Sequence, residues 1–310
     1  MIVNQVEQLI GNTPLFEFAA EDFGGYYGTK IYAKLEYLNP GGSIKDRLGE
    51  YLLKAAMKAG KVQSGTTIIE PTAGNTGIGL ALAAVPLGLK VMVVVPEKFS
   101  LEKQQLMTAL GAKIVHTKTE DGIIGAIAKA QELAKEIKNS YIPLQFENFD
   151  NPAAYYQTLG PEIFSELAGE LTSFVAGIGS GGSFAGTGKF LQENSMNLRL
   201  IGVEPEGSIL NGGPAGSHEI EGIGVEFVPP FLAELPVNEI YTISDLTGFT
   251  YTRMLAKNYG LLVGSSSGAA LAAAIEESKK LPAGSKIVTI FPDAGDRYLS
   301  KNIYSPTLFD

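Results

Sequence analysis

The chain has 310 residues, of which 45% are hydrophobic and 18% charged, and it carries a formal net charge of -9. This composition is typical of a soluble enzyme, the length favours two domains, and the acidic balance argues against binding to nucleic acid. Cysteine is absent and the only two histidines, His116 and His218, lie far apart, so we expect neither a metal site nor a Ser-His-Asp triad. The sequence shows no run of about 18 apolar residues and no export signal, so we expect a cytoplasmic protein without a membrane span.

From residue 30 onward, short runs rich in β-branched residues alternate with segments of helical periodicity. Strands are expected in residues 30–38, 66–71, 90–96, 112–117, 172–178, 199–205, 261–264 and 286–292. Helices are expected in residues 45–60, from near residue 75, and in 100–111, 122–138, 184–193 and 265–281. Strands such as KVMVVVP are apolar at nearly every position, as in a parallel sheet that helices cover on both faces. The sequence therefore predicts an α/β chain with doubly wound, mostly parallel sheets.

The segment QFENFDNP, residues 145–152, interrupts this periodicity and indicates a domain boundary. We expect a smaller α/β domain in residues 39–148 and a larger α/β domain in residues 149–310. Residues 1–38 are expected to pack mainly with the larger domain. Residues 206–230 form a long irregular loop, and loops of that length inside a compact domain are usually functional or mobile.

Lys45 follows a tight Asn-Pro-Gly-Gly turn at the predicted start of the first long helix. Ser43 is a plausible N-cap for this helix. One face of the helix is indicated by apolar residues at helical spacing, namely Ile44, Leu48, Leu52 and Ala56. A cation in the first turn opposes the positive end of the helix dipole, where Asp or Glu is the usual choice. An ordinary surface lysine is the common explanation, and the position raises the question of what else holds a lysine there.

Three glycine-rich turns each follow a predicted strand and open a helix, which is where open α/β sheets bind ligands. They are EPTAGNTGIG at 70–79, AGIGSGGSFAGTG at 176–188 and VGSSSGAA at 263–270. The second turn offers consecutive backbone N–H groups, two hydroxyls and a helix N-terminus, which together suit a phosphate group. The residues that form this predicted phosphate loop are Gly179, Ser180, Gly181, Gly182 and Ser183.

Two kinds of cofactor are compatible with the second turn. It matches the dinucleotide pattern G-x-G-x-x-G through Gly177, Gly179 and Gly182, and Glu204 ends the next predicted strand. A hydride-transfer enzyme, however, needs an acid-base group that the two isolated histidines do not obviously supply. A pyridoxal phosphate site needs a lysine, a phosphate loop, a partner for the ring nitrogen and donors for the substrate carboxylate. Lys45, residues 179–183, the serines at 265–267 and the loop at 72–76 are candidates for these four roles.

Together these motifs resemble the β-replacing pyridoxal phosphate enzymes of the tryptophan synthase β-subunit fold, the cysteine synthase and cystathionine β-synthase group. The resemblance runs from IGNTPL at 10–15 to FPDAGDRYLS at 291–300. NPGGSIKDR is similar to the family's Schiff-base motif, TAGNTG to its substrate loop and GSGGS to its phosphate loop. The resemblance implies two doubly wound domains with the active site in the cleft between them, and pyridoxal 5'-phosphate as the cofactor.

Residue roles follow from the same resemblance. Lys45 is implied to be the catalytic Schiff-base lysine, and Ser266 to face the ring nitrogen, with Ser265 and Ser267 as neighbouring alternatives. Cofactor contacts are implied for Lys45, Asn75, Gly179, Ser180, Gly181, Gly182, Ser183 and Ser266. Substrate contacts are implied for Thr72, Ala73, Gly74, Asn75, Thr76, Gln145, Glu221 and Gly222. Ala73 departs from the family's usual serine, which puts one contact to the substrate carboxylate in question.

The implied reaction is β-replacement on O-acetyl-L-serine by a thiol through an α-aminoacrylate intermediate, with sulfide giving L-cysteine and homocysteine giving L-cystathionine. The segment EIEGIGVEFVP, residues 219–229, resembles cystathionine β-synthases more than ordinary cysteine synthases, and the chain resembles their compact bacterial type. Glu221 and Ser208 are candidates for contacts to homocysteine, with a purely loop-fixing role as the alternative. Other hypotheses are an L-serine-dependent cystathionine β-synthase, a phosphate-ligand binding module and a nicotinamide oxidoreductase. The implied partners are small molecules and a second copy of the chain in a homodimer.

Overall fold

The computed structural model describes residues 2–72 and 74–305, and contacts within it divide the chain into two compact units. The first unit comprises Met1–Ile10 and Asn39–Asn151, and the second comprises Gly11–Leu38 and Pro152–Asp310. No helix in the described part of the chain is both long enough and apolar enough to cross a membrane.

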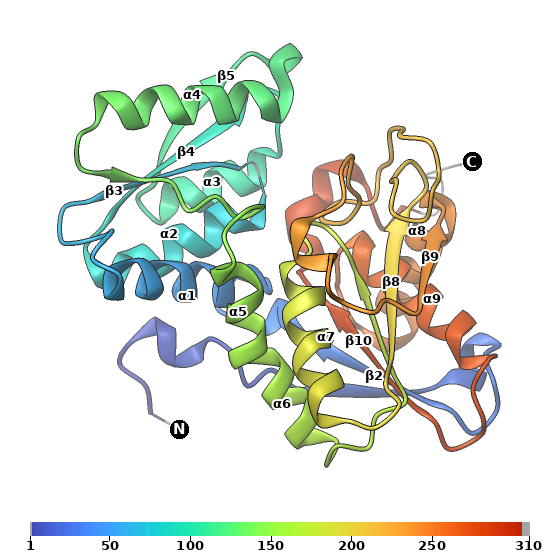
Figure 1. Ribbon diagram of the computed structural model, residues 1–310. Helices are drawn as coiled ribbons and strands as arrows, with labels where there is room; N and C mark the ends of the chain where they lie inside the picture. Colours follow the sequence, from blue (N-terminus) through green and yellow to red (C-terminus); the bar gives the residue numbers. More distant parts are fainter. Residues whose placement is uncertain (1, 73, 306–310) are drawn as a thin grey trace. The chain divides into compact units, whose positions relative to one another are not determined.

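The first unit contains a four-stranded parallel sheet with the strand order β5-β4-β3-β6. Its strands are β3 (Thr67–Pro71), β4 (Lys90–Pro96), β5 (Lys113–Thr117) and β6 (Ser140–Tyr141). Its helices are α1 (Lys45–Lys58), α2 (Asn75–Leu87), α3 (Leu101–Ala109) and α4 (Gly122–Glu136), with the short 3-10 helices η1 (Val6–Leu9) and η4 (Thr119–Asp121). Figure 1 shows α4 on one face of this sheet and α1, α2 and α3 on the other.

Side chains of the central strands alternate between two cores. Ile68 and Val93 belong to the core on the α2 side, whereas Ile69 and Val94 pack with Ala126 of α4 on the opposite face. Because successive side chains of a strand point to opposite faces, both faces are apolar only when helices cover both. The doubly wound architecture predicted from KVMVVVP is confirmed.

The second unit contains a six-stranded sheet with the order β1-β2-β10-β7-β8-β9, in which only the β1–β2 pair is antiparallel. Its strands are β1 (Leu15–Ala19), β2 (Lys30–Leu35), β7 (Ser173–Gly177), β8 (Arg199–Pro205), β9 (Glu239–Ile243) and β10 (Lys286–Phe291). Its helices are α6 (Leu159–Glu166), α7 (Gly182–Asn194), α8 (Asp245–Tyr259) and α9 (Ser265–Ser278). Helix α5 (Asp150–Gln157) begins at the end of the first unit's sequence, and the 3-10 helices are η2 (Ala20–Phe23), η3 (Glu36–Leu38), η5 (Pro230–Leu232) and η6 (Gly295–Lys301).

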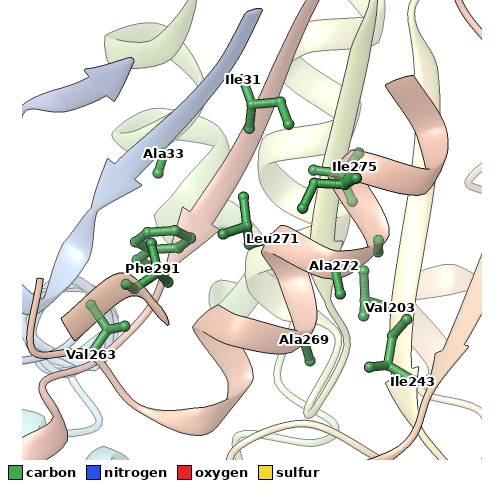
Figure 2. Packing of buried hydrophobic residues seen from close by; sticks show 14 of the residues in the cluster. Ile31, Ala33, Val203, Ile243, Val263, Ala269, Leu271, Ala272, Ile275 and Phe291 are labelled. Carbon is green, nitrogen blue, oxygen red and sulfur yellow. The ribbon is translucent and has the colours of Figure 1, made fainter. Parts of the chain in front are cut away.

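The alanine-rich helix α9 packs directly on this second sheet. Figure 2 shows Leu271 and Ile275 of α9 among side chains of the strands, including Val203, Ile31 and Phe291. On the opposite face of the sheet, Phe174 of β7 stacks on a ring of α7, that of Phe184, with centroids 5.9 Å apart. Burial of these apolar faces is the main force that holds the unit together, at roughly 25 cal/mol for each Å² of apolar surface removed from water.

Two local features differ from the expectations. The expected strand at 261–264 is reduced to a single bridge between Val263 and Ala294, and the side chain of Leu262 is 58% exposed. Strand β9 and helix α8 were not predicted, because β9 is a half-exposed edge strand and three threonines and two tyrosines interrupt the apolar pattern of α8. At the N-terminus, Val6 and Ile10 lie against α1 and α2 of the first unit, whereas Gly11–Leu38 belong to the second, larger unit.

Helices α1 and α2 touch through their backbones. A Cβ atom on Gly49 would overlap the carbonyl group of Gly79, and a Cβ atom on Gly79 would overlap the carbonyl oxygen of Lys45. Both glycines are therefore required by the close approach of the two helices, and this crossing fixes the first residue of α1 against α2.

Gly49→Ala should lower the free energy of unfolding by about 1 to 3 kcal/mol, the usual cost of overpacking, although alanine favours an isolated helix by about 1 kcal/mol. Denaturant titration measures the change. A variant that is more stable than wild type would show that the two backbones are not in contact.

Candidate active site

Lys45 is the first residue of α1, as the sequence predicted, and its side chain is half-buried. The hydroxyl of the buried Ser43 accepts a hydrogen bond from the Lys45 N–H at 3.2 Å. The turn before the helix is closed by the carboxylate of Asp46, which accepts the N–H of Gly41 at 2.5 Å. A side chain on Gly41 would collide with this carboxylate, so the turn and the helix start form one rigid piece.

The loop after β3 opens α2, with Asn75 as the first helical residue. The Thr72 hydroxyl accepts a hydrogen bond from the Gly74 N–H at 3.3 Å, and both Thr72 and Thr76 are buried. Ala73 lies outside the described residues. The loop therefore places the start of α2 in the same unit as Lys45, and the α1–α2 crossing holds both helix starts.

Gln145 is buried and its side-chain amide is held from two sides within the first unit. The Thr76 hydroxyl donates to Gln145 Oε1 at 2.9 Å, and Gln145 Nε2 donates to Glu70 Oε1 at 3.4 Å. The Gln145 main chain is held as well, since Asn151 Nδ2 donates to its carbonyl oxygen at 2.7 Å. Gln145 and Thr76, both predicted from sequence to contact substrate, thus come together.

Glu70 was not among the residues singled out from sequence. It lies on β3 just before the loop, its side chain is fully buried, and burial raises the pKa of its carboxyl to about 8, which the hydrogen bond from Gln145 offsets only in part. The available signal was a glutamate that directly follows the apolar run Thr67–Ile69 and precedes a glycine-rich loop. Such a residue at the carboxyl end of a parallel strand is placed to act on a ligand.

In the second unit, the predicted phosphate loop joins β7 to α7. Gly181 caps α7 with a φ of 84°, a left-handed conformation that favours glycine. A Cβ atom on Gly179 would lie 2.5 Å from the carbonyl oxygen of Gly222, and one on Gly181 would lie 2.9 Å from a side-chain carbon of Pro229. The loop is therefore bare of side chains at these two positions, and it ends at the N-terminus of a 13-residue helix. This arrangement fits a phosphate group, because helix N-termini present N–H donors and the positive end of the dipole.

The three serines at the start of α9 differ in their hydrogen bonding. All three are buried, and the Ser265 hydroxyl accepts the Glu221 N–H at 3.3 Å. The Ser267 hydroxyl is buried without a hydrogen-bond partner among the described residues. A role at the cofactor ring nitrogen is thus open to Ser266 and Ser267, while Ser265 is engaged with the neighbouring loop.

Residues Glu221 and Ser208 make contacts within the chain itself. The Glu221 carboxylate pairs with Lys301 Nζ at 2.6 Å, and the Ser208 hydroxyl accepts the Val225 N–H at 3.0 Å. Gly222 has a φ of 86° and packs against the phosphate loop. These contacts favour the loop-fixing alternative for both side chains, and substrate contacts by Glu221 and Gly222 stay a prediction.

Glu204 bears on the dinucleotide hypothesis. Its buried carboxylate accepts the Leu210 N–H at 2.8 Å, the Asn211 N–H at 3.2 Å and the Thr242 hydroxyl at 2.9 Å. These protein groups already use the acidic side chain that a dinucleotide fold would offer to a ribose. The phosphate loop is therefore better explained by a cofactor with a single phosphate.

The structure thus gathers the predicted residues into two groups, one in each unit. The first holds Lys45, Thr72, Gly74, Asn75, Thr76 and Gln145, and the second holds Gly179, Ser180, Gly181, Gly182, Ser183, Glu221, Gly222 and Ser266. A lysine, an anion-binding loop and an uncharged hydroxyl are the groups that pyridoxal phosphate requires from a protein.

Comparison with known proteins agrees with this chemistry. The family model described as "Pyridoxal-phosphate dependent enzyme" matches residues 6–293. A cysteine synthase of Helicobacter pylori strain J99 is 64% identical over 305 residues, covering 98% of this chain and 100% of the relative. An O-acetylserine dependent cystathionine beta-synthase of Bacillus subtilis strain 168 is 55% identical over 303 residues, covering 98% of both chains.

A solved structure gives the same result for the fold. The crystal structure of an O-acetylserine dependent cystathionine beta-synthase from Helicobacter pylori has a TM-score of 0.95 and 63% identity, with 98% of this chain and 100% of that chain covered. The chain therefore belongs to the family of pyridoxal-phosphate dependent enzymes.

Proposed function

We propose that this enzyme catalyses β-replacement on O-acetyl-L-serine, in which acetate leaves the substrate Cβ and the sulfur of a thiol takes its place. Sulfide would give L-cysteine and homocysteine would give L-cystathionine, in line with relatives that bear both names. The observation that carries the proposal is Lys45, a half-buried lysine at the first position of a helix whose preceding turn is locked by Asp46.

Bound pyridoxal phosphate supplies an electron sink for the electron pair left at the substrate Cα. Lys45 Nζ removes the Cα proton, and the positive end of α1 favours the neutral, basic form of this amine. Asn75, Thr76 and Gln145 bind the amino-acid substrate in the first unit. In the second unit, residues 179–183 bind the phosphate, and the Ser266 hydroxyl faces the ring nitrogen.

An uncharged partner at the ring nitrogen has a chemical consequence. A hydroxyl such as that of Ser266 leaves this nitrogen unprotonated, whereas a carboxylate would stabilise its protonated form. With the cofactor bound, a hydroxyl at this position would leave a weaker electron sink, which would suit loss of a leaving group from the substrate Cβ.

Oligomeric state and location belong to the same proposal. The enzyme acts on small molecules, and we infer that it works as a homodimer, as the sequence resemblance implies. We also propose that it is cytoplasmic, as expected from the sequence pattern. Sedimentation equilibrium of the purified holoenzyme measures the first point directly, and a monomer at micromolar concentration would contradict it.

Lys45→Ala should lower kcat by about 10²- to 10⁴-fold, the usual contribution of a catalytic base, and leave circular dichroism unchanged. Lys58→Ala changes an exposed lysine at the other end of the same helix and serves as the control. Steady-state turnover of O-acetyl-L-serine with sulfide measures both. Near-normal turnover in Lys45→Ala would remove this lysine from the mechanism.

Gly181→Asp should weaken retention of the cofactor more than Gly181→Asn does. Both variants add the same Cβ atom at a position with a φ of 84°, where Asn and Asp are the best tolerated substitutes, so their difference isolates the charge. Each charge-assisted hydrogen bond lost is worth about 1.5 to 3 kcal/mol, so the apparent Kd for pyridoxal phosphate should differ by about tenfold or more. Equal Kd values for the two variants would argue against phosphate binding by this loop.

Glu221→Gln tests the choice of thiol. If Glu221 contacts homocysteine, this variant lowers homocysteine-dependent turnover and spares sulfide-dependent turnover, with about 1.4 kcal/mol for each tenfold change in selectivity. Lys301→Gln breaks the same ion pair from the other side and is the matched control. Equal losses with both thiols, or the same loss in both variants, would make Glu221 a structural residue.

A further inference from the structure

Glu70 is a buried carboxyl group that the proposed reaction has not yet used. Its side chain is 1% exposed, and Glu70 Oε2 is buried without a hydrogen-bond partner among the described residues. Its other oxygen, Oε1, faces the Gln145 amide at 3.4 Å. In the described part of the chain no Lys or Arg forms an ion pair with Glu70, so the group is buried with an uncharged partner only.

The charged groups around Glu70 are few. Glu70 pairs in register with Val93 of β4 and shares a strand face with Ile68, on the side away from α4. Strand β6 contributes Tyr141, whose pKa is raised mainly by burial and slightly by Glu70, and α3 contributes the buried Lys103 on the α2 side. Burial and the Gln145 amide alone set the pKa of Glu70. The charged side chains of α4, which covers the opposite face, are Lys129, Glu132, Lys135 and Glu136.

We propose that Glu70 is a positioning residue: in its neutral form it orients the Gln145 amide so that this amide can bind the carboxylate of the amino-acid substrate. The inference rests on the substrate-binding role proposed for Gln145. Thr76 occupies Gln145 Oε1 and Glu70 Oε1 accepts one Nε2–H, which leaves the second Nε2–H as the donor for a substrate carboxylate. The Thr76 hydroxyl on Gln145 Oε1 and Glu70 Oε1 on Gln145 Nε2 together hold the amide in one orientation.

Glu70 must be neutral because an ionised Glu70 carboxylate would be separated from the substrate carboxylate only by the side-chain amide of Gln145. Burial raises the pKa of Glu70 to about 8, so the group is neutral at pH 7 and ionises mostly above pH 8. Two like charges at this separation inside a protein repel each other far more than they would in water. Substrate affinity should therefore fall as the pH rises through about 8.

The binding test compares wild-type holoenzyme with Glu70→Gln, which keeps the size of the side chain and an acceptor oxygen but cannot ionise. Titration calorimetry gives the Kd for L-serine at pH 7 and pH 9. Groups that titrate in both proteins cancel in the comparison, so the wild-type Kd should rise about tenfold more than that of Glu70→Gln over this range. Glu277→Gln changes another buried glutamate, one paired with Arg199, and should keep the wild-type pH dependence. L-serine amide lacks the carboxylate charge and should show no difference between wild type and Glu70→Gln.

A second readout needs no substrate. The folded protein keeps the Glu70 proton between the ordinary pKa of 4.5 and about 8, whereas the unfolded chain releases it, so wild type loses stability as the pH rises through this window. The melting temperature of Glu70→Gln minus that of wild type should therefore increase steadily from pH 5 to pH 8, by several degrees. Above pH 8 this difference should stay constant. A constant difference would show that Glu70 is ionised in the folded protein and would overturn the inference.

The outcomes separate the two proposals. Equal pH dependence of L-serine binding in wild type and Glu70→Gln would overturn the role of Glu70 and leave the proposed function standing. Wild-type affinity for L-serine in Gln145→Ala would overturn the binding role of Gln145, and with it this inference.

Discussion

The first unit depends on a contact made without side chains, the crossing of α1 and α2 at Gly49 and Gly79. The crossing sets the carbonyl group of Lys45 against the second turn of α2, whose first residue is Asn75. The proposed catalytic amine and the proposed substrate-binding loop therefore share one rigid support, because packed helix backbones cannot slide past each other without collisions. The Asp46 carboxylate extends this support to the turn before Lys45. Preorganisation of this kind lowers the cost of orienting reacting groups.

In the second unit, carboxylates of the chain itself shape the long loop at 206–230. Glu204 accepts two main-chain N–H groups at its beginning, and the Asp245 carboxylate accepts the N–H groups of Glu219 and Ile220 at 2.8 and 3.0 Å. The carbonyl oxygen of Gly222 in turn lies where a side chain on Gly179 would be. The 206–230 loop is thus an ordered segment that supports the predicted phosphate loop.

Local patterns in the sequence were sufficient for most strands and helices, and for the place of Lys45, because caps and periodicity depend on near neighbours. They were insufficient where the deciding partner is distant in sequence. Glu70 accepts a hydrogen bond from Gln145, which lies 75 residues away in the sequence. Glu221 forms an ion pair with Lys301 near the end of the described chain. Ser265, Ser266 and Ser267 are adjacent residues of the same type, and a hydrogen bond from another loop distinguishes Ser265 from its neighbours. Pairings of this kind arise from tertiary packing, which residue patterns do not encode locally.

The central claim is that Lys45 holds the cofactor covalently. Borohydride reduction of the native holoenzyme, followed by proteolysis and mass spectrometry, measures this attachment directly. If Lys45 holds the cofactor, the phosphopyridoxyl group is found on the peptide containing Lys45 and on no other lysine peptide. A label on a different lysine, such as the buried Lys103 of α3, would contradict it.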